Sequence, residues 1–590
     1  MGASSACIVI DGVVVAAVEE ERLTRLKNDG GFPFEAIRMC LDSAEMSMED
    51  LDQIAVYWKP WKIVDRGLAV FKSLIVNPRS VLFMLKRLLQ SLFGLYQDRD
   101  RYPELRGSWL DLFRIKSKLR DEFGDFSATI RFYDHHDTHA ASIFYLSNFD
   151  NAICLTYDGG GETSSTIVHA FTKGIPERLL EIGWPNSLGH YYSAFTGFLG
   201  FRMLEGEYKM MGLAPYGKPV YKDKILENIL LKSSGGKYKL NTSVLNYHSA
   251  LGGVFSNKLE ELFGPARHKD EEFNQRHRDL ACSVQAAYEE VLLHILTWAK
   301  SRKPEYENLC IAGGCALNVT ANGKVVTEGL FTNIVIPPAP HDAGCAIGAA
   351  WLSELEIGTP ADKLIMQSPY LGRDYSKIDI ERAFVEMGLS VPEMFNEDEL
   401  IERSVAALAS SEILAWFQGG SEFGPRALGN RSFLADPRND SIREVLNSKI
   451  KKRELFRPFA PSCKSESARE FFIMDHESPY MNIVATVRED KRNIIPAVTH
   501  IDGTARVHTV TQSSNPLYWR LLDAFENKTG VGVLLNTSLN IQEPIVESPT
   551  QAISCFLRSS VDWLVIGPYM CGDDWRKRIL KLDREERNVL

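Results

Sequence analysis

Long apolar runs and closely spaced cysteine pairs are both missing from the sequence. The ten cysteines are scattered and none forms a CxxC pair, so neither a zinc ribbon nor a disulfide framework is indicated. We therefore expect a reduced, cytoplasmic setting. The most apolar stretch, residues 67–96, is interrupted by four basic residues and by Pro78, which leaves no run of about 18 apolar residues for a transmembrane helix. This pattern predicts two amphipathic helices within a helical insertion over about 60–125.

An excess of positive charge is also absent. The 67 lysines and arginines are outnumbered by 77 acidic residues, which gives a formal net charge of −10. A broad electrostatic grip on nucleic acid needs clustered basic residues, so we do not expect a nucleic-acid partner. A small site for one anion remains compatible with this balance.

The length and the hydrophobic pattern indicate an α/β protein of more than one domain. With 590 residues, the chain is too long for a single hydrophobic core. Apolar strands followed by glycine turns recur at 6–19, 151–172 and 308–318, and residues 280–300 have helical spacing. We predict a first domain over 1–357, a linker with a small helix over 358–399, and a second α/β domain over 400–590.

Histidines and aspartates supply a candidate metal site. In RFYDHHDTHAAS, His135 and His139 are four residues apart, so on a helix both imidazoles share one face. Asp158 ends an apolar strand, and Asp342 stands in a loop before a helix. Such a set favours Fe(II), Mn(II) or Zn(II) over Mg(II), which prefers oxygen ligands. From the residues alone, a polar helix start and capping aspartates remain alternatives.

Glycine loops supply candidate phosphate sites. DGGGE at 158–162 and AGGCALN at 312–318 each follow an apolar strand. Glycine lets a phosphate approach the backbone closely, although ordinary tight turns use the same residues. The segment EGEYKMMGLAPYGKP at 205–219 is typical of a shaped binding loop.

The C-terminal half carries basic residues among aromatics, glycines and prolines. They include Arg426, Lys451, Arg457 and Arg506, and Ser538 in NTSLN adds a hydroxyl donor. Guanidinium groups bind phosphate and carboxylate through two parallel hydrogen bonds, so these residues predict an oxyanion pocket. Ion pairs between domains are the alternative.

Eight segments together closely resemble the carbamoyltransferase family of the NodU/CmcH type. They are HHDTHAAS, YDGGG, EYKMMGLAPYG, GGCALN, HDAGCAIGAA, FGPRALGNRS, KKRELFRPFAPS and LLNTSLN. The resemblance follows the family's order over nearly the whole chain and is weakest at 58–125 and 355–400. It implies an actin-like ATPase domain similar to the tRNA threonylcarbamoyl-transfer enzyme TsaD, followed by a YrdC-like α/β domain.

The resemblance implies an ATP-dependent O-carbamoyltransferase. In that family, carbamoyl phosphate and ATP give carbamoyl adenylate, and the carbamoyl group then passes to a hydroxyl of a small-molecule acceptor. The expected ligands are therefore ATP with Mg, carbamoyl phosphate, an alcohol and one further divalent metal, with Fe(II) favoured. No membrane partner is expected, and a homodimer is compatible with the resemblance.

The resemblance also implies roles for individual residues. The implied metal ligands are His135, His139, Asp158 and Asp342. The implied nucleotide positions are Gly159, Gly160, Glu207, Gly313, Gly314 and Asn318, and Lys27 and Asn318 are implied as catalytic. The implied positions for carbamoyl phosphate and ATP are Arg426, Lys451, Arg457, Arg506 and Ser538.

One position departs from the family's pattern. The family has a first strand and a loop histidine, a candidate general base, ahead of the hairpin, and Gly2 stands at the position of that histidine here. We expect either that the start is truncated relative to the family's chains or that another base serves, for which His190 in SLGHYYSAFT is the candidate. Two other functions stay open: a tRNA threonylcarbamoyl-transfer enzyme, and a metal- and nucleotide-bound switch with partners docked on 67–96. The sequence does not identify the acceptor.

Overall fold

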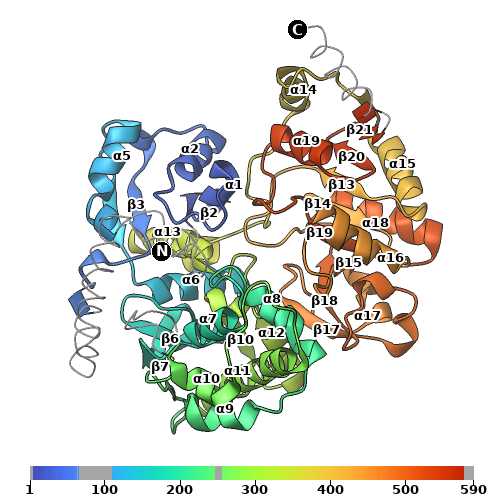
Figure 1. The fold of residues 1–590 in the computed structure, drawn as a ribbon. Coiled ribbons are helices and arrows are strands. Elements are labelled where there is room, and N and C mark those ends of the chain that lie inside the picture. The colour runs from blue at the N-terminus through green and yellow to red at the C-terminus, as the bar shows by residue number, and fades with distance from the viewer. Residues whose placement is uncertain (1–3, 63, 66–108, 246–254, 574, 577–590) are drawn as a thin grey trace. The chain divides into compact units, whose positions relative to one another are not determined.

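The computed structural model describes residues 4–62, 64–65, 109–245, 255–573 and 575–576 (Figure 1). The chain divides into two compact units: Met1–Thr24 with Asn28–Gln367, and Arg25–Lys27 with Ser368–Leu590. Both units combine helices with sheets, which confirms the predicted α/β class. The helices predicted within 67–96 lie outside the described residues. None of the helices that the structure describes has the length and apolar character needed to cross a membrane.

The first unit begins with an antiparallel hairpin that turns at Asp11 and Gly12. Its strands are β1 (Ser5–Ile10) and β2 (Val13–Glu19). Asp11 and Gly12 have φ angles of 51° and 84°, the conformation that makes Asp-Gly a favoured two-residue turn. Several elements share the hydrophobic core of this hairpin. They are α2 (Phe34–Ser43), α5 (Ile115–Phe123) and the parallel pair β3 (Gln53–Val56) and β4 (Thr129–Phe132), with α1 (Glu20–Thr24) beside them.

A five-stranded sheet with the order β11-β10-β5-β6-β7 forms the second part of this unit. Its parallel strands are β5 (Asn151–Tyr157), β10 (Asn308–Ala312) and β11 (Asn333–Val335). The antiparallel strands β6 (Ser164–Thr172) and β7 (Ile175–Gly183) complete the sheet beyond β5. Because β5, β10 and β11 run in one direction, the loops that follow them meet at one edge of the sheet.

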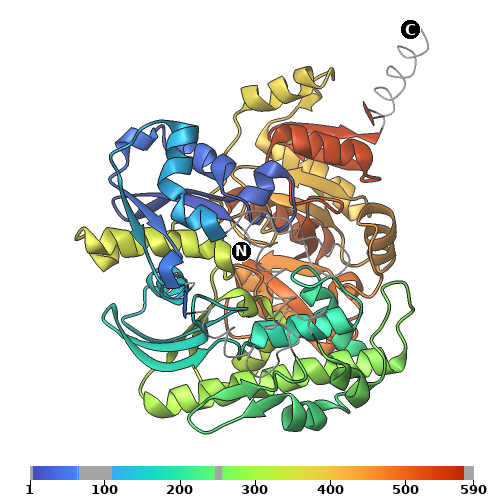
Figure 2. The ribbon, with the colours of Figure 1, turned by 60° about the vertical axis from the view of Figure 1, so that its left-hand side comes forward.

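Helices surround this sheet. They are α6 (His135–Ser147), α7 (Leu188–Phe198), α8 (Glu207–Leu213), α9 (Lys222–Asn228), α10 (Asn257–Phe263), α11 (Gln275–Arg302), α12 (Val319–Glu328) and α13 (Cys345–Glu356). A small hairpin of β8 (Leu230–Lys232) and β9 (Tyr238–Leu240) follows α9. The predicted helical segment 280–300 lies within α11, the long light-green helix of Figure 2.

Helices α6 and α13 pack with their backbones in contact. A Cβ atom added at Gly348 of α13 would lie only 1.8 Å from the carbonyl oxygen of Thr138 on α6. Glycine at this position is therefore a packing requirement, because any side chain would force the two helices apart. The first turns of both helices carry predicted site residues or follow them directly.

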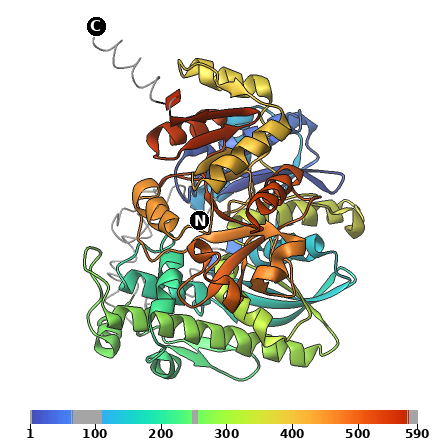
Figure 3. The same cartoon turned by 90° about the vertical axis from the view of Figure 1, so that its right-hand side faces the viewer.

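The second unit is built on a ten-stranded sheet with the order β12-β21-β20-β13-β14-β19-β15-β18-β17-β16 (Figure 3). Its strands are β12 (Glu393–Met394), β13 (Leu414–Phe417), β14 (Arg431–Ala435), β15 (Ala460–Lys464), β16 (Phe472–Ile473), β17 (Ile483–Val487), β18 (Thr504–Val510), β19 (Val533–Ser538), β20 (Trp563–Ile566) and β21 (Tyr569–Gly572). Its helices are α14 (Lys377–Glu386), α15 (Glu397–Ala409), α16 (Ser441–Glu444), α17 (Ala468–Phe471), α18 (Pro516–Thr529) and α19 (Pro549–Arg558).

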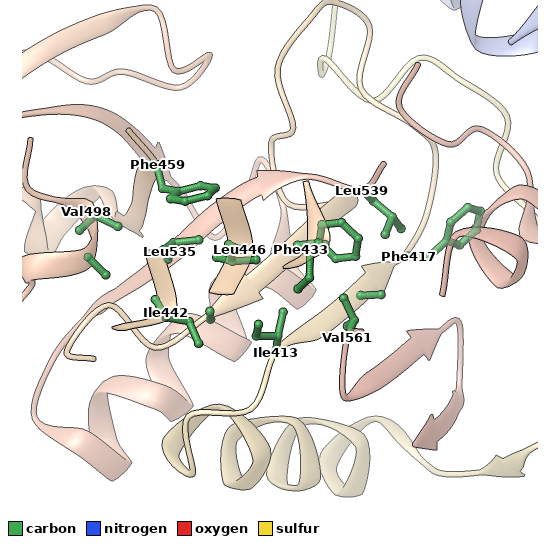
Figure 4. Packing of buried hydrophobic residues seen from close by; sticks show 14 of the residues in the cluster. Ile413, Phe417, Phe433, Ile442, Leu446, Phe459, Val498, Leu535, Leu539 and Val561 are labelled. Carbon is green, nitrogen blue, oxygen red and sulfur yellow. The ribbon is translucent and has the colours of Figure 1, made fainter. Parts of the chain in front are cut away.

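Two hydrophobic clusters cover the sheet of the second unit. One cluster contains buried residues of α14, α16 and α19, and the other contains buried residues of α15 and α18. Figure 4 shows Leu446 of the first cluster between Phe433 and Leu535, which come from neighbouring strands. The sheet is therefore covered by helices on both faces, as its nearly continuous apolar strands require.

The region predicted as a linker, 358–399, is divided between the two units. Residues 358–367 group with the first unit and residues 368–399 with the second. The small helix predicted there is α14, and it is part of the domain core rather than of a linker. Its Ile380, Ala383 and Phe384 are buried in the larger hydrophobic cluster.

A buried histidine lies in the sheet of the second unit. The Nδ1 atom of His508 on β18 is 2.8 Å from Ser462 Oγ on β15, and the ring of His508 stacks on Tyr518. Asn536 donates a hydrogen bond of 3.0 Å to Ser462 Oγ. Burial lowers the pKa of His508 to about 3, so its imidazole is neutral in the folded protein.

We expect His508 to make the protein sensitive to acid. Below about pH 6.5 the unfolded chain binds a proton at His508 that the folded chain excludes, so stability present at neutral pH is lost as the pH falls. His508→Asn keeps an acceptor near Nδ1 and does not titrate. It should remove about 2 kcal/mol of the stability loss between pH 7 and pH 5. Urea denaturation of the full chain at both pH values measures this difference. The same substitution at the exposed His268 is the control, and equal pH dependence in wild type and His508→Asn would contradict the expectation.

Candidate active site

Helix α6 brings the two predicted histidine ligands beside the two predicted aspartates. The Nε2 atoms of His135 and His139 lie 3.2 Å and 3.3 Å from Asp158 Oδ2. The same atoms lie 3.7 Å and 4.0 Å from Asp342 Oδ1. Both imidazoles are buried, and the four ligand atoms are all within 4.8 Å of one another. This set, called the His–Asp cluster below, has the donors and the spacing to hold one cation.

Local backbone structure explains why Asp158 fits in this cluster. Asp158 follows β5, and the turn after the parallel strand β10 passes directly beside it. Gly313 has a φ angle of 96°, and a Cβ atom there would lie 2.1 Å from Tyr157 O. A Cβ atom at Gly314 would lie 3.0 Å from Asp158 Oδ1. The two glycines predicted as nucleotide positions therefore also make room for the aspartate.

The N-terminus of α6 is held by Glu162, which the sequence analysis did not single out. Its Oε1 and Oε2 atoms lie 3.3 Å and 3.2 Å from the amide nitrogen of His135, and Lys59 N donates to Oε1 at 2.9 Å. Asp134, just before the helix, forms ion pairs with Lys59 and Lys62. Carboxylates at a helix N-terminus are favourable for the helix dipole. The last residue of DGGGE thus fixes the first turn of the histidine helix.

The third histidine of HHDTH has a structural role. His136 Nδ1 lies 3.0 Å from Thr156 Oγ1 and its Nε2 lies 3.1 Å from Ser164 O. Both ring nitrogens are therefore occupied by β5 and β6. Burial holds the pKa of His136 well below its ordinary value, and the charges of His135 and His139 add to this effect.

The electrostatics of the His–Asp cluster favour positive charge. Burial alone would raise the pKa of Asp158, but hydrogen bonds with His135 and His139 hold it well below its usual range. Burial, and then the charge of Asp158, raise the pKa of Asp342. Burial opposes the charged form of His139, yet Cys345 and Asp158 raise the pKa of His139 to about 9. A divalent cation would supply the positive charge that these groups favour.

A second polar cluster in the first unit joins Asn318 and Glu207 to residues of α7 and α11. Gln285 and Asn318 exchange two amide hydrogen bonds of 3.0 Å, and Tyr192 OH donates to Gln285 Oε1 at 2.8 Å. Gln285 also donates to Glu289 Oε1 at 2.7 Å. Burial raises the pKa values of Glu207 and Glu289, and after burial both carboxylates raise the pKa of Tyr192. Gln285 and Glu289 stand four residues apart on α11, a spacing from which this cluster could have been found.

The remaining positions predicted for the first unit are more scattered. His190 on α7 lies over the DGGGE turn, because a Cβ atom at Gly159 would be 3.7 Å from its Cε1 atom. Gly160 is part of the same turn. Lys27 is exposed and groups with the second unit, so it does not share the fold of the other positions.

The second unit gathers four arginines in one place. Burial, and then the charges of Arg426, Arg453 and Arg457, hold the pKa of Arg506 well below its ordinary value. Arg457 Nη1 also lies 3.8 Å from Glu454 Oε2, so one carboxylate adjoins these arginines. The Nε atom of Arg506 is buried and makes no hydrogen bond within the part of the chain that the structure describes. Buried like charges are unfavourable until a counter-ion joins them, so this arginine cluster suits an anionic ligand.

Lys451 and Ser538 contact each other directly. Lys451 Nζ donates to the carbonyl and hydroxyl oxygens of Ser538 and to both oxygens of Asn540, with distances of 2.9 Å and 2.7 Å to Asn540. Asn447 holds the adjoining loop, because its Oδ1 accepts from Arg453 Nε at 2.7 Å and its Nδ2 donates to Arg457 O at 3.2 Å. Asn447 and Asn540 extend the site beyond the residues predicted from sequence.

Comparison with known proteins identifies the family. The profile described as Carbamoyltransferase N-terminus matches residues 2–351, and that described as Carbamoyltransferase C-terminus matches residues 405–572. Nodulation protein NolNO of Sinorhizobium fredii is 37% identical over 98% of this chain and 81% of its own length. The 3'-hydroxymethylcephem-O-carbamoyltransferase of Amycolatopsis lactamdurans is 38% identical over 48% of this chain and 51% of its own length. An uncharacterised protein of Synechocystis is 40% identical over 95% of this chain and 94% of its own length.

The chain belongs to the carbamoyltransferase family. This confirms the resemblance predicted from the eight sequence segments and the prediction that the protein is a transferase enzyme. The crystal structure of HypF from T. kodakarensis covers 43% of this chain and 40% of its own at 15% identity, with a TM-score of 0.23, too low to support an argument.

We predict that the His–Asp cluster binds one divalent ion per chain. His139→Ala removes one of four ligands, so it should weaken binding of that ion by about a hundredfold or more. Elemental analysis of protein purified without a metal-affinity resin, followed by competition with a chelator, measures the effect. His294→Ala, on α11 and outside the cluster, is the control. Equal metal content in wild type and His139→Ala would show that the cluster is not a metal site.

Proposed function

We propose that the protein is an ATP-dependent O-carbamoyltransferase that works through carbamoyl adenylate. The observation that carries this proposal is the arginine cluster of the second unit, because four neighbouring cations, of which Arg457 is paired with Glu454, are arranged for a phosphate-rich ligand. In an acidic chain, an anionic ligand would compensate the mutual repulsion of these arginines. Carbamoyl phosphate and the phosphates of ATP are both concentrated negative charges.

We assign adenylate formation to the second unit. Hydrolysis of carbamoyl phosphate first gives carbamate and phosphate. The carbamate oxygen then attacks the α-phosphorus of ATP, and pyrophosphate leaves. Arg426, Arg457 and Arg506 would hold the phosphates, and the arginine charges would stabilise the charge that develops on the phosphoryl oxygens. Lys451 is held by Ser538 and Asn540 and would act as a point charge beside them. Mg would accompany the ATP.

We assign transfer to the first unit. The acceptor oxygen attacks the carbamoyl carbon, its proton passes to a base, and AMP leaves. His135, His139, Asp158 and Asp342 fit a divalent ion of the Fe(II), Mn(II) or Zn(II) type, since they offer two imidazoles and two carboxylates at the required spacing. Such an ion supplies Lewis acidity toward a carbonyl oxygen when it is bound. We propose His190 as the base, because its ring lies over the turn that follows Asp158.

The buried polar cluster around Tyr192 suits the sugar of a nucleotide. Glu207 and Glu289 are buried carboxyl groups that can exchange hydrogen bonds with hydroxyl groups, and Asn318 offers an amide beside them. The turns at Gly159, Gly160, Gly313 and Gly314 would let phosphates approach the backbone. We therefore propose that the nucleotide portion of the adenylate binds here.

The acceptor is proposed to be a hydroxyl of a small molecule. Support comes from the name of one relative, a 3'-hydroxymethylcephem-O-carbamoyltransferase. The net charge of −10 disfavours a transfer RNA acceptor.

We expect the two half-reactions to be separable by mutation. Arg506→Ala should reduce carbamoyl-AMP formation from ATP and carbamoyl phosphate by about a hundredfold or more, because an unpaired phosphate charge costs several kcal/mol. His139→Ala should leave carbamoyl-AMP formation within about threefold of wild type and stop carbamoyl-ester formation. Mass spectrometry measures both products in reactions containing a panel of sugar and hydroxymethylcephem alcohols.

Arg382→Ala, which alters an exposed arginine of α14, is the matched control and should change neither step. If Arg506→Ala and His139→Ala lose both steps equally, the division between the units is wrong. If the wild-type protein makes no carbamoyl-AMP, the adenylate route is wrong.

A further inference from the structure

The imidazoles of the His–Asp cluster have a second ring nitrogen, which points away from the aspartates. Cys345 Sγ lies 3.9 Å from His135 Nδ1 and 4.0 Å from His135 O. The sulfur and one nitrogen of each of His135 and His139 are all within 4.8 Å of one another. His139 Nδ1 is buried and has no hydrogen-bond partner among the described residues. A fully buried thiol therefore lies behind the ring of His135.

The fold fixes the thiol in this place. Cys345 is the first residue of α13, and Gly348 stands one turn further along the same face of the helix. Contact between Gly348 and Thr138 brings α13 as close to α6 as two backbones allow. Because α6 carries both histidines, this contact also sets the distance between the sulfur and the imidazoles.

The sulfur is badly placed to be a ligand of the same ion as the aspartates. The two nitrogens of an imidazole point in different directions, and here Nε2 faces Asp158 and Asp342 while Nδ1 faces Cys345. Histidines that bind a metal through one nitrogen usually donate the other N–H to an acceptor, which fixes the tautomer and the ring orientation. A carboxylate is the common acceptor, but it would add a further negative charge to this cluster.

We infer that Cys345 is a positioning residue of the metal site, with its sulfur accepting the Nδ1–H of His135. The thiol proton can then be donated to His135 O, so that sulfur, ring and helix backbone are linked. This arrangement keeps the Nε2 lone pair of His135 directed at the ion. The inference rests on the proposed metal site of the His–Asp cluster.

Binding of Co(II) and of Mn(II) alone, without nucleotide or carbamoyl phosphate, tests this inference on the full chain. Cys345→Ala should weaken binding by about 10–100-fold, the usual cost of removing a group that orients a metal ligand. Cys345→Ser keeps an acceptor and should recover most of the affinity. Cys154→Ala is the matched control, because its buried sulfur also lies under α6, at 4.0 Å from Ala140 O, but not behind the imidazoles.

Three results would overturn the inference. In the first, Cys345→Ala binds the ions as tightly as wild type and as the control Cys154→Ala. In the second, Cys345→Ser is as weak as Cys345→Ala while both variants unfold at the wild-type temperature. In the third, a sulfur-to-cobalt charge-transfer band in the wild-type protein is lost in Cys345→Ser, since Cys345 would then be a direct ligand. Failure of the wild-type protein to bind either ion would instead refute the proposed metal site and the inference with it.

Discussion

Compensation between two buried imidazoles and two largely buried carboxylates is the interaction on which the first unit depends. Each of these groups would lose stabilising hydration if it were buried alone. Together they place opposite charges within hydrogen-bond range, and Asp158 faces both histidines. The rest of the unit supports this arrangement. The two aspartates follow parallel strands that end at the same edge of the sheet, and glycine turns leave space for their side chains. Helix α6 carries both histidines.

The second unit brings like charges together instead of opposite ones. There Arg506 has three other arginines as its electrostatic neighbours. Repulsion among them is unfavourable for the free protein, and attraction to a bound anion would compensate it. The two units therefore suit ligands of opposite charge: the site of the first suits a cation, and the site of the second suits phosphates. A two-step reaction that begins with phosphate chemistry and ends with attack on a carbonyl can use both.

Sequence patterns indicated the candidate ligand side chains of the His–Asp cluster better than the residues that hold those side chains in place. The i,i+4 spacing of His135 and His139 and the strand-end positions of Asp158 and Asp342 are visible in one dimension. Glu162, Cys345 and Asn447 act through contacts that only the fold creates, such as a carboxylate reaching the N-terminus of a helix that precedes it in the chain. Helix α14, within the predicted linker 358–399, is a related case, because it is short and packs in a core formed with residues far along the chain.

The contact between Gly348 and Thr138 has a consequence for which ions suit the site. Since the two helix backbones already touch, α13 cannot move toward α6 to tighten the cluster, and a helix register fixes where the loop bearing Asp342 ends. We therefore infer that the spacing of the four ligand atoms in the His–Asp cluster is nearly constant, so that the site selects ions by their radius. We expect it to discriminate against calcium, which needs 6–8 oxygen ligands at about 2.3–2.6 Å, independently of any preference for nitrogen donors. If competition with a chelator gave the same affinity for Ca²⁺ as for Mn²⁺, the His–Asp cluster would not select ions by radius.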